Sequence, residues 1–99
     1  MIDHQELIHS IEEKQSAYIA AASQIWDYAE TAFQEYRSAQ TLEELLEQAG
    51  FQVRRNVAGM ETAFVAEAGS GKPVIGFLGE YVALPGLSQQ ADVAVHTPI

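Results

Sequence analysis

Hydrophobic residues in the first thirty positions recur at the spacing of an α-helix. They stand three, four or seven positions apart and so fall on one stripe: Leu7, Ile11, Tyr18, Ala22, Ile25 and Ala29. Asp3 can cap the start of this helix, with Glu6 three residues later as in a capping box. Because no Gly or Pro interrupts the stretch, the pattern predicts one long helix over residues 3–29.

A second helical pattern follows after a short ambiguous stretch. Thr31 and Gln34 have the spacing of a capping box, which places the start of a helix near residue 31. Its apolar face is formed by Leu42, Leu45, Leu46 and Ala49. Gly50 stands where a glycine commonly ends a helix. The pattern therefore predicts a helix that runs to Ala49.

The hydrophobic period then changes to that of β-strands. Phe51 and Val53 alternate with polar residues, and residues 62–67 are rich in β-forming side chains. The run 74–78 is almost continuously apolar, as expected of a strand that is buried on both faces. We therefore expect Phe77, in the middle of this run, to be a core residue.

Two helices followed by three strands give an α/β fold class with the element order ααβββ. We expect the two helices to pack on a small mixed sheet whose edges remain open. The 99 residues are enough for one small domain at most. We expect residues 1–99 to form one incomplete domain, in which residues 88–99 are an irregular tail.

The charge and composition of the chain limit the classes of molecule that it is expected to bind. With 14 acidic and 5 basic residues, the formal net charge is −9, which disfavours nucleic acids and anionic membranes. No apolar run approaches the roughly 20 residues of a membrane span, and the acidic residues of the first positions do not fit a signal peptide. There is no cysteine. We expect a soluble, cytoplasmic protein.

Most candidate motifs for chemistry have a simpler structural interpretation. The segment Gly69–Lys72 lacks the first glycine and the Ser or Thr of a phosphate-binding loop, so a connecting turn explains it. His4 and His9 stand five apart and do not share a helix face, and His96 has no evident second ligand. The aromatic residues near the inter-helix junction, Trp26, Tyr28, Phe33 and Tyr36, are expected to pack in the core.

Glu80 is the one ionisable residue placed directly after the most apolar strand. Sites in open α/β sheets form just beyond the carboxyl ends of strands, so Glu80 is a candidate site residue. A solvated loop carboxylate explains the same position equally well.

Several segments together resemble the aminoacylase/carboxypeptidase class of metallopeptidases, and within it the p-aminobenzoyl-glutamate hydrolase branch of amidohydrolases. The similar segments are residues 25–35, 56–60, 62–67, 72–81 and 83–89. The resemblance extends from about Ile8 to Gln89. It implies that the chain is the N-terminal piece of a longer enzyme with a mixed-sheet catalytic domain.

The resemblance also implies a chemistry. The family hydrolyses amide bonds of N-acyl or N-aroyl amino acids such as p-aminobenzoyl-glutamate, with one or two zinc or manganese ions, a metal-bound water and a glutamate base. Glu80 stands at a position that is a metal ligand in some branches. Val82 replaces an Asp that orients a metal-site histidine in the family, so that role is lost here.

The family's main metal-binding segment and its catalytic glutamate have no counterpart in this chain. We therefore expect a fragment that contains no catalytic residue, binds no metal ion alone and is inactive alone. One alternative is a small interaction module that self-associates or pairs with a full-length relative through its open sheet edge. Another is an enzyme completed in trans by a chain that carries the missing ligands.

Overall fold

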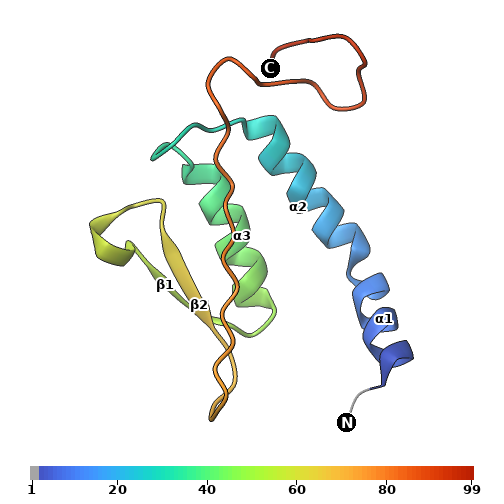
Figure 1. The fold of residues 1–99 in the computed structure, drawn as a ribbon, viewed down its shortest axis with the longest axis vertical. Helices are drawn as coiled ribbons and strands as arrows, with labels where there is room; N and C mark the ends of the chain where they lie inside the picture. Colours follow the sequence, from blue (N-terminus) through green and yellow to red (C-terminus); the bar gives the residue numbers. More distant parts are fainter. Residues whose placement is uncertain (1–2) are drawn as a thin grey trace.

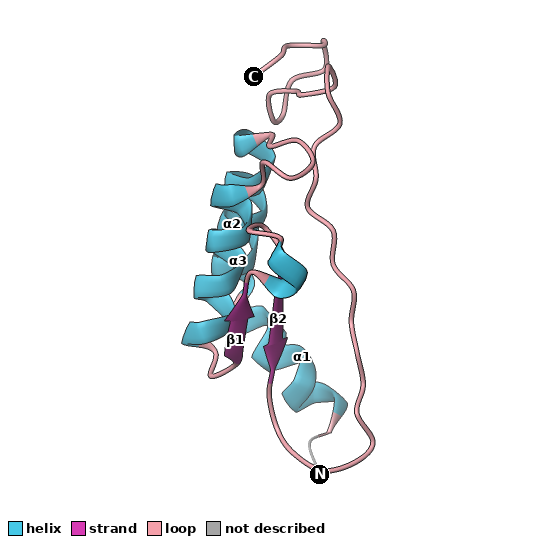
Figure 2. Ribbon diagram, turned by 90° about the vertical axis from the view of Figure 1, so that its left-hand side faces the viewer, coloured by secondary structure: helices cyan, strands magenta, loops and turns pink. Residues whose placement is uncertain are grey.

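The computed structural model describes residues 3–99 and confirms the α/β class. Within that range it contains three helices, one short 3-10 helix and two strands (Figures 1 and 2). Their bounds are α1 His4–Glu13, α2 Gln15–Tyr28, α3 Tyr36–Gln48, β1 Gln52–Arg55, η1 Val57–Gly59 and β2 Phe64–Glu67.

The first predicted helix is divided into α1 and α2. Asp3 caps α1 as expected, because its carboxylate accepts a hydrogen bond of 2.8 Å from the backbone N–H of Glu6. The division falls at Lys14, whose φ of −99° and ψ of 0° leave the helical region. No residue of α1 is buried, so no tertiary packing opposes this distortion.

The second helix, α3, begins at Tyr36 and not at Thr31. Ala29 takes the left-handed conformation at the end of α2, and the chain then runs irregularly up to α3. The end of α3 is as predicted: Gly50, with φ of +96°, follows the last turn. The N–H of Phe51 bonds the carbonyl of Leu46 at 3.0 Å, which is the long hydrogen bond of a Schellman motif.

β1 and β2 form a two-stranded antiparallel sheet. The register pairs Val53 with Ala66 and Arg55 with Phe64. The sheet packs against α3, and α3 packs against α2 on its other side, so α3 is the central element (Figure 1). Two strands leave both edges of the sheet open.

The predicted third strand does not form, and the expectation of a buried Phe77 is wrong. Residues 74–78 are extended, pair with no other strand and are all exposed. Phe77 is 95% exposed. In Figure 2 this part of the chain runs well to one side of α3 and the sheet. An apolar strand needs layers on both faces, and residues 3–99 place no layer against either face of this run.

The core is small. Among residues 3–99 the buried hydrophobic side chains are Ala21 and Ala39, where α2 and α3 meet. The expected aromatic core is wrong, since Trp26, Phe33 and Tyr36 are each at least half exposed. The radius of gyration is 16.0 Å, compared with about 13 Å for a compact chain of this length. The described part of the chain contains no helix that is long and apolar enough to cross a membrane.

Candidate functional site

The segment that contains Glu80 is fastened to the body of the protein just after the extended run. The Tyr81 hydroxyl donates a hydrogen bond to the carbonyl of Thr62, and the Tyr81 ring stacks on Phe64 with centroids 6.3 Å apart. Two residues later, the N–H of Ala83 donates to the carbonyl of Glu30 at 2.7 Å. These contacts hold the segment against the start of β2 and the end of α2.

A pocket of about 270 Å³ lies along this segment. Residues from three parts of the chain line it: Ala32, Phe33, Glu35, Thr62, Ala63, Gly79, Glu80, Tyr81 and Val82. Most of its surface is apolar, and Glu35 and Glu80 are its two carboxylates. Glu35 is buried and accepts a 2.8 Å hydrogen bond from the N–H of Phe33, whereas Glu80 is exposed. Glu80 is thus the one carboxylate of this pocket that is available to a ligand.

The side chain of Glu30 caps the N-terminus of α3. Its carboxylate accepts hydrogen bonds from the N–H groups of Ser38 at 2.7 Å and Arg37 at 3.1 Å, the third and second residues of that helix. Burial alone would raise the pKa of Glu30, but these hydrogen bonds outweigh it, so the pKa lies below its ordinary value. Glu30 is therefore an ionised structural group.

Tyr81 is also held in one protonation state. Its partial burial raises the pKa of the phenol, and the negative charges of Glu35 and Glu43 raise it further. The neutral hydroxyl is therefore a hydrogen-bond donor over the whole physiological range, and its hydrogen bond goes to Thr62. Its function in this structure is to fix the position of the Glu80 segment.

The histidines do not gather at this pocket. His9 pairs with Glu13 at 2.9 Å on the exposed surface of α1, and His4 lies on the same helix. His96 is exposed in the irregular tail. Across residues 3–99 no group of three or more His, Asp or Glu side chains is placed to hold a metal ion. The described residues therefore do not fit the metal site that the family resemblance implies.

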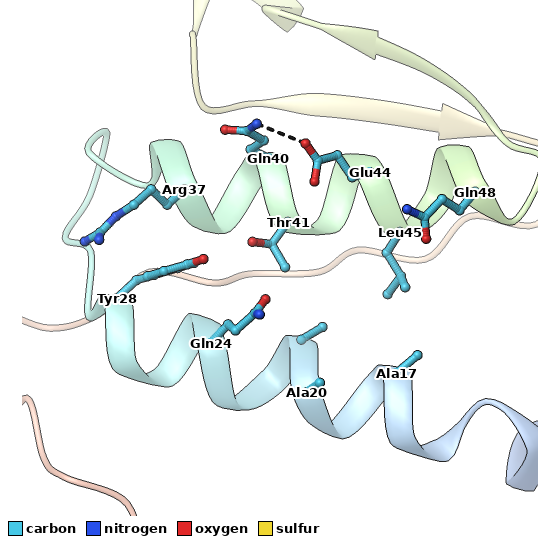
Figure 3. Close-up of a pocket in the computed structure, with 11 residues that line it drawn as sticks. Ala17, Ala20, Gln24, Tyr28, Arg37, Gln40, Thr41, Glu44, Leu45 and Gln48 are labelled. Atoms are coloured by element: carbon cyan, nitrogen blue, oxygen red, sulfur yellow. Dashed lines mark hydrogen bonds between the residues drawn. The ribbon is translucent and has the colours of Figure 1, made fainter.

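A larger groove of about 420 Å³ lies between α2 and α3 (Figure 3). Short side chains on α2, such as Ala17 and Ala20, leave this space open against the polar face of α3. At one end the guanidinium carbon of Arg37 lies 4.5 Å from the centroid of the Tyr28 ring, which is a cation–π contact. None of the sequence motifs points to this groove.

Two ionic contacts that hold α3 in place are marked by no sequence motif. Glu43 is buried and pairs with Arg55, and Glu30 caps α3 across the loop. No local pattern marks either residue, because their partners lie seven to twelve positions away. The role of Glu30 as a helix cap had one available signal. Its carboxylate stands just after the end of one predicted helix and near the start of the next.

No family model matches the chain. A comparison with known proteins nevertheless confirms the amidohydrolase family that the motifs resemble. The relative found is a subunit of p-aminobenzoyl-glutamate hydrolase from Escherichia coli (strain K12), which is 52% identical over 90 residues. The match covers 91% of this chain and 19% of the relative. The chain belongs to the family of this hydrolase subunit and spans about a fifth of the relative's length.

Proposed function

We propose that the chain is one part of a metal-dependent amidohydrolase that cleaves p-aminobenzoyl-glutamate and related N-aroyl or N-acyl amino acids, and that it is inactive alone. The observation that carries this proposal is the 52% identity to a p-aminobenzoyl-glutamate hydrolase subunit. In this proposal the chain contributes helices and strands of the catalytic domain, and the rest of the enzyme contributes the metal ligands.

The contacts that occupy the carboxylates support the proposal that the chain is inactive alone. Glu30 binds the start of α3, Glu35 binds the N–H of Phe33, and Glu43 binds Arg55. Glu80 is the remaining carboxylate at the pocket, and one carboxylate is too few for a zinc or manganese site, which takes at least three protein ligands in a hydrolase. Beside it, the side chain of Val82 has no oxygen or nitrogen, so it cannot orient a metal-bound histidine as the family's aspartate does.

The direct test is hydrolysis of p-aminobenzoyl-glutamate by the purified chain with added zinc or manganese. Released p-aminobenzoate is separated by chromatography, with the E. coli hydrolase as the positive control. We expect no turnover above the rate without protein. Turnover that disappears in Glu80→Gln but persists in the surface variant Glu12→Gln would show that the chain is catalytically complete and would overturn the proposal.

The exposed strand-like run favours a second candidate function. Both sheet edges and residues 74–78 are open, and the relative is named as a subunit of a hydrolase. The chain could therefore serve as an interaction module that pairs with a full-length relative. Co-purification of the tagged chain with the full-length E. coli relative tests this idea. Stable co-purification that Phe77→Lys abolishes favours it, and its absence argues against it.

A further inference from the structure

The loop of residues 29–35 joins α2 to α3 and also contributes to the lining of the smaller pocket. Ala32, Phe33 and Glu35 line the pocket from this loop. Ala29 and Phe33 have φ values of +47° and +64°, in the left-handed region that residues other than glycine rarely adopt. Such a conformation persists only where the surrounding contacts fix it. The contacts that hold this loop therefore decide the shape of one side of the pocket.

Glu30 holds the loop through its side chain, of which only 9% is exposed. Its carboxylate accepts hydrogen bonds from the N–H of Ser38 at 2.7 Å and from the N–H of Arg37 at 3.1 Å. Nε of Arg37 adds a contact at 3.3 Å. Hydrogen bonds to an ionised acceptor are stronger than those between neutral groups. The carboxylate is therefore firmly attached to the first turn of α3.

The backbone of the same residue receives the segment that carries Glu80. The carbonyl of Glu30 accepts the N–H of Ala83 at 2.7 Å, and in Figure 1 this segment passes beside the loop between α2 and α3. Glu80 and Val82, which precede Ala83 directly, line the pocket. Tyr81 holds the segment at a second point, on the side of the sheet. Glu30 thus connects α3, the loop and the Glu80 segment.

We propose that Glu30 is a positioning residue of the pocket. Its carboxylate anchors the loop 29–35 on α3, which places the Glu30 carbonyl opposite the N–H of Ala83. That contact sets the position of Glu80 and Val82. Glu30 does not line the pocket itself and acts on it through Ala83. The proposal concerns the geometry of the free chain, and only an effect of Glu30 on turnover in a complete hydrolase rests on the proposed function.

Amide hydrogen exchange of Ala83, followed by NMR, tests the proposal in the 99-residue chain. Loss of the carboxylate in Glu30→Ala should speed the exchange of Ala83 about fivefold, the usual weight of a helix cap. Glu30→Gln keeps one oxygen as an acceptor, so its rate should lie between those of Glu30→Ala and the wild type. The amide proton resonance of Ala83 should move upfield in the same order, because the 2.7 Å hydrogen bond deshields that proton.

Two control variants separate positioning from a general loss of stability. Gln40→Gly weakens α3 at an exposed position through helix propensity, an effect of the same order as a cap, and does not touch Glu30. Arg37→Met removes the exposed side-chain contact with Glu30 but leaves the backbone N–H groups in place. Each control should change the exchange rate of Ala83 by less than about twofold. Circular dichroism checks that every variant keeps its helices.

Two results would overturn the positioning role. One is a wild-type exchange rate of Ala83 in Glu30→Ala, since the loop would then hold the carbonyl in place without the carboxylate. The other is an equal acceleration in Gln40→Gly, because Ala83 would then report only the stability of the whole chain. If Glu30→Ala loses its helices, the same two comparisons are made with Glu30→Gln.

Discussion

Nε of Arg55, on β1, lies 2.6 Å from the carboxylate of Glu43 on α3, and the same guanidinium also bonds Glu47. The two carboxylates, Glu47 first and then Glu43, raise the pKa of Arg55. Because the buried hydrophobic side chains of the described region are two alanines, this ionic clamp is a main connection between helix and sheet. We therefore expect the packing of the sheet on α3 to depend on these two ion pairs.

Removal of the clamp is expected to loosen the sheet from α3. Arg55→Met leaves the buried Glu43 without its partner and should lower the Tm by more than about 5 °C. The Tm of Arg55→Lys should lie between those of the wild type and Arg55→Met, because one ammonium cannot hold both carboxylates as a planar guanidinium does. Arg54→Met removes only an exposed pair with Glu67 and is the control. Equal effects of the Arg54 and Arg55 variants in thermal melts would contradict this assignment.

Glu30 should stabilise the protein as a helix cap in its ionised form. Glu30→Ala is expected to cost about 1 kcal/mol in urea unfolding at neutral pH. Because the folded pKa lies below the ordinary value, this stabilisation is present above about pH 4.3 and disappears as the pH falls through the lowered pKa. The stability difference between wild type and Glu30→Gln should therefore shrink at acidic pH. A difference that stays constant down to pH values below the lowered pKa would show that the charge is not involved.

Tyr81 should act through its hydroxyl as well as its ring. Tyr81→Phe keeps the stack on Phe64 but removes the hydrogen bond to Thr62, so we expect a loss of about 0.5–1.5 kcal/mol. The raised pKa means that this stabilisation is present below about pH 10 and is lost as the pH rises through the higher folded value. The tyrosinate absorbance of wild type minus that of Tyr81→Phe gives the pKa directly. Tyr18→Phe, at an exposed ring on α2, is the matched control.

Phe77 should contribute almost nothing to the stability of the monomer. Since its side chain is 95% exposed, Phe77→Ala should change the free energy of unfolding by no more than about 0.5 kcal/mol in dilute solution. Phe64→Ala is the comparison, because Phe64 is half-buried and stacks on Tyr81, and it should cost about 2 kcal/mol or more. A large loss in Phe77→Ala at dilution would mean that the run 74–78 packs inside the monomer.

Val82 tests the proposed relation to the metal-dependent hydrolases. The side chain is 44% exposed, so Val82→Asp should change stability by less than about 1 kcal/mol. It should restore no hydrolysis of p-aminobenzoyl-glutamate in this chain, because an aspartate alone activates no water. The same change in a longer chain with a complete metal site should raise activity about tenfold to a hundredfold. If Val82→Asp does not raise the activity of the longer chain, Val82 does not occupy the family's aspartate position.

The sequence predicted those elements whose signals are local. Asp3 as the cap of α1 and Gly50 as the end of α3 are both found, because caps depend on neighbours within one or two turns. The alternation at Phe51 and Val53 likewise marks β1. The family was predicted from several segments together, and the 52% identity confirms it.

The predictions that were wrong concern contacts between residues that are far apart in the sequence. Thr31 was expected to start α3, but Glu30 provides the cap from outside the helix, so α3 begins at Tyr36. The run 74–78 has the composition of a buried strand, yet burial depends on neighbouring layers that the pattern of one segment cannot supply. The Arg55 clamp on Glu43 is a long-range ionic contact of the same kind.

The open backbone of residues 74–78 has a consequence for how the free chain would be handled in a cell. Chaperones and proteases act on extended apolar segments that are free of partners. This run is such a segment, because its large side chains are exposed and it pairs with no other strand. Any contact that covers the run would therefore also protect the chain from degradation.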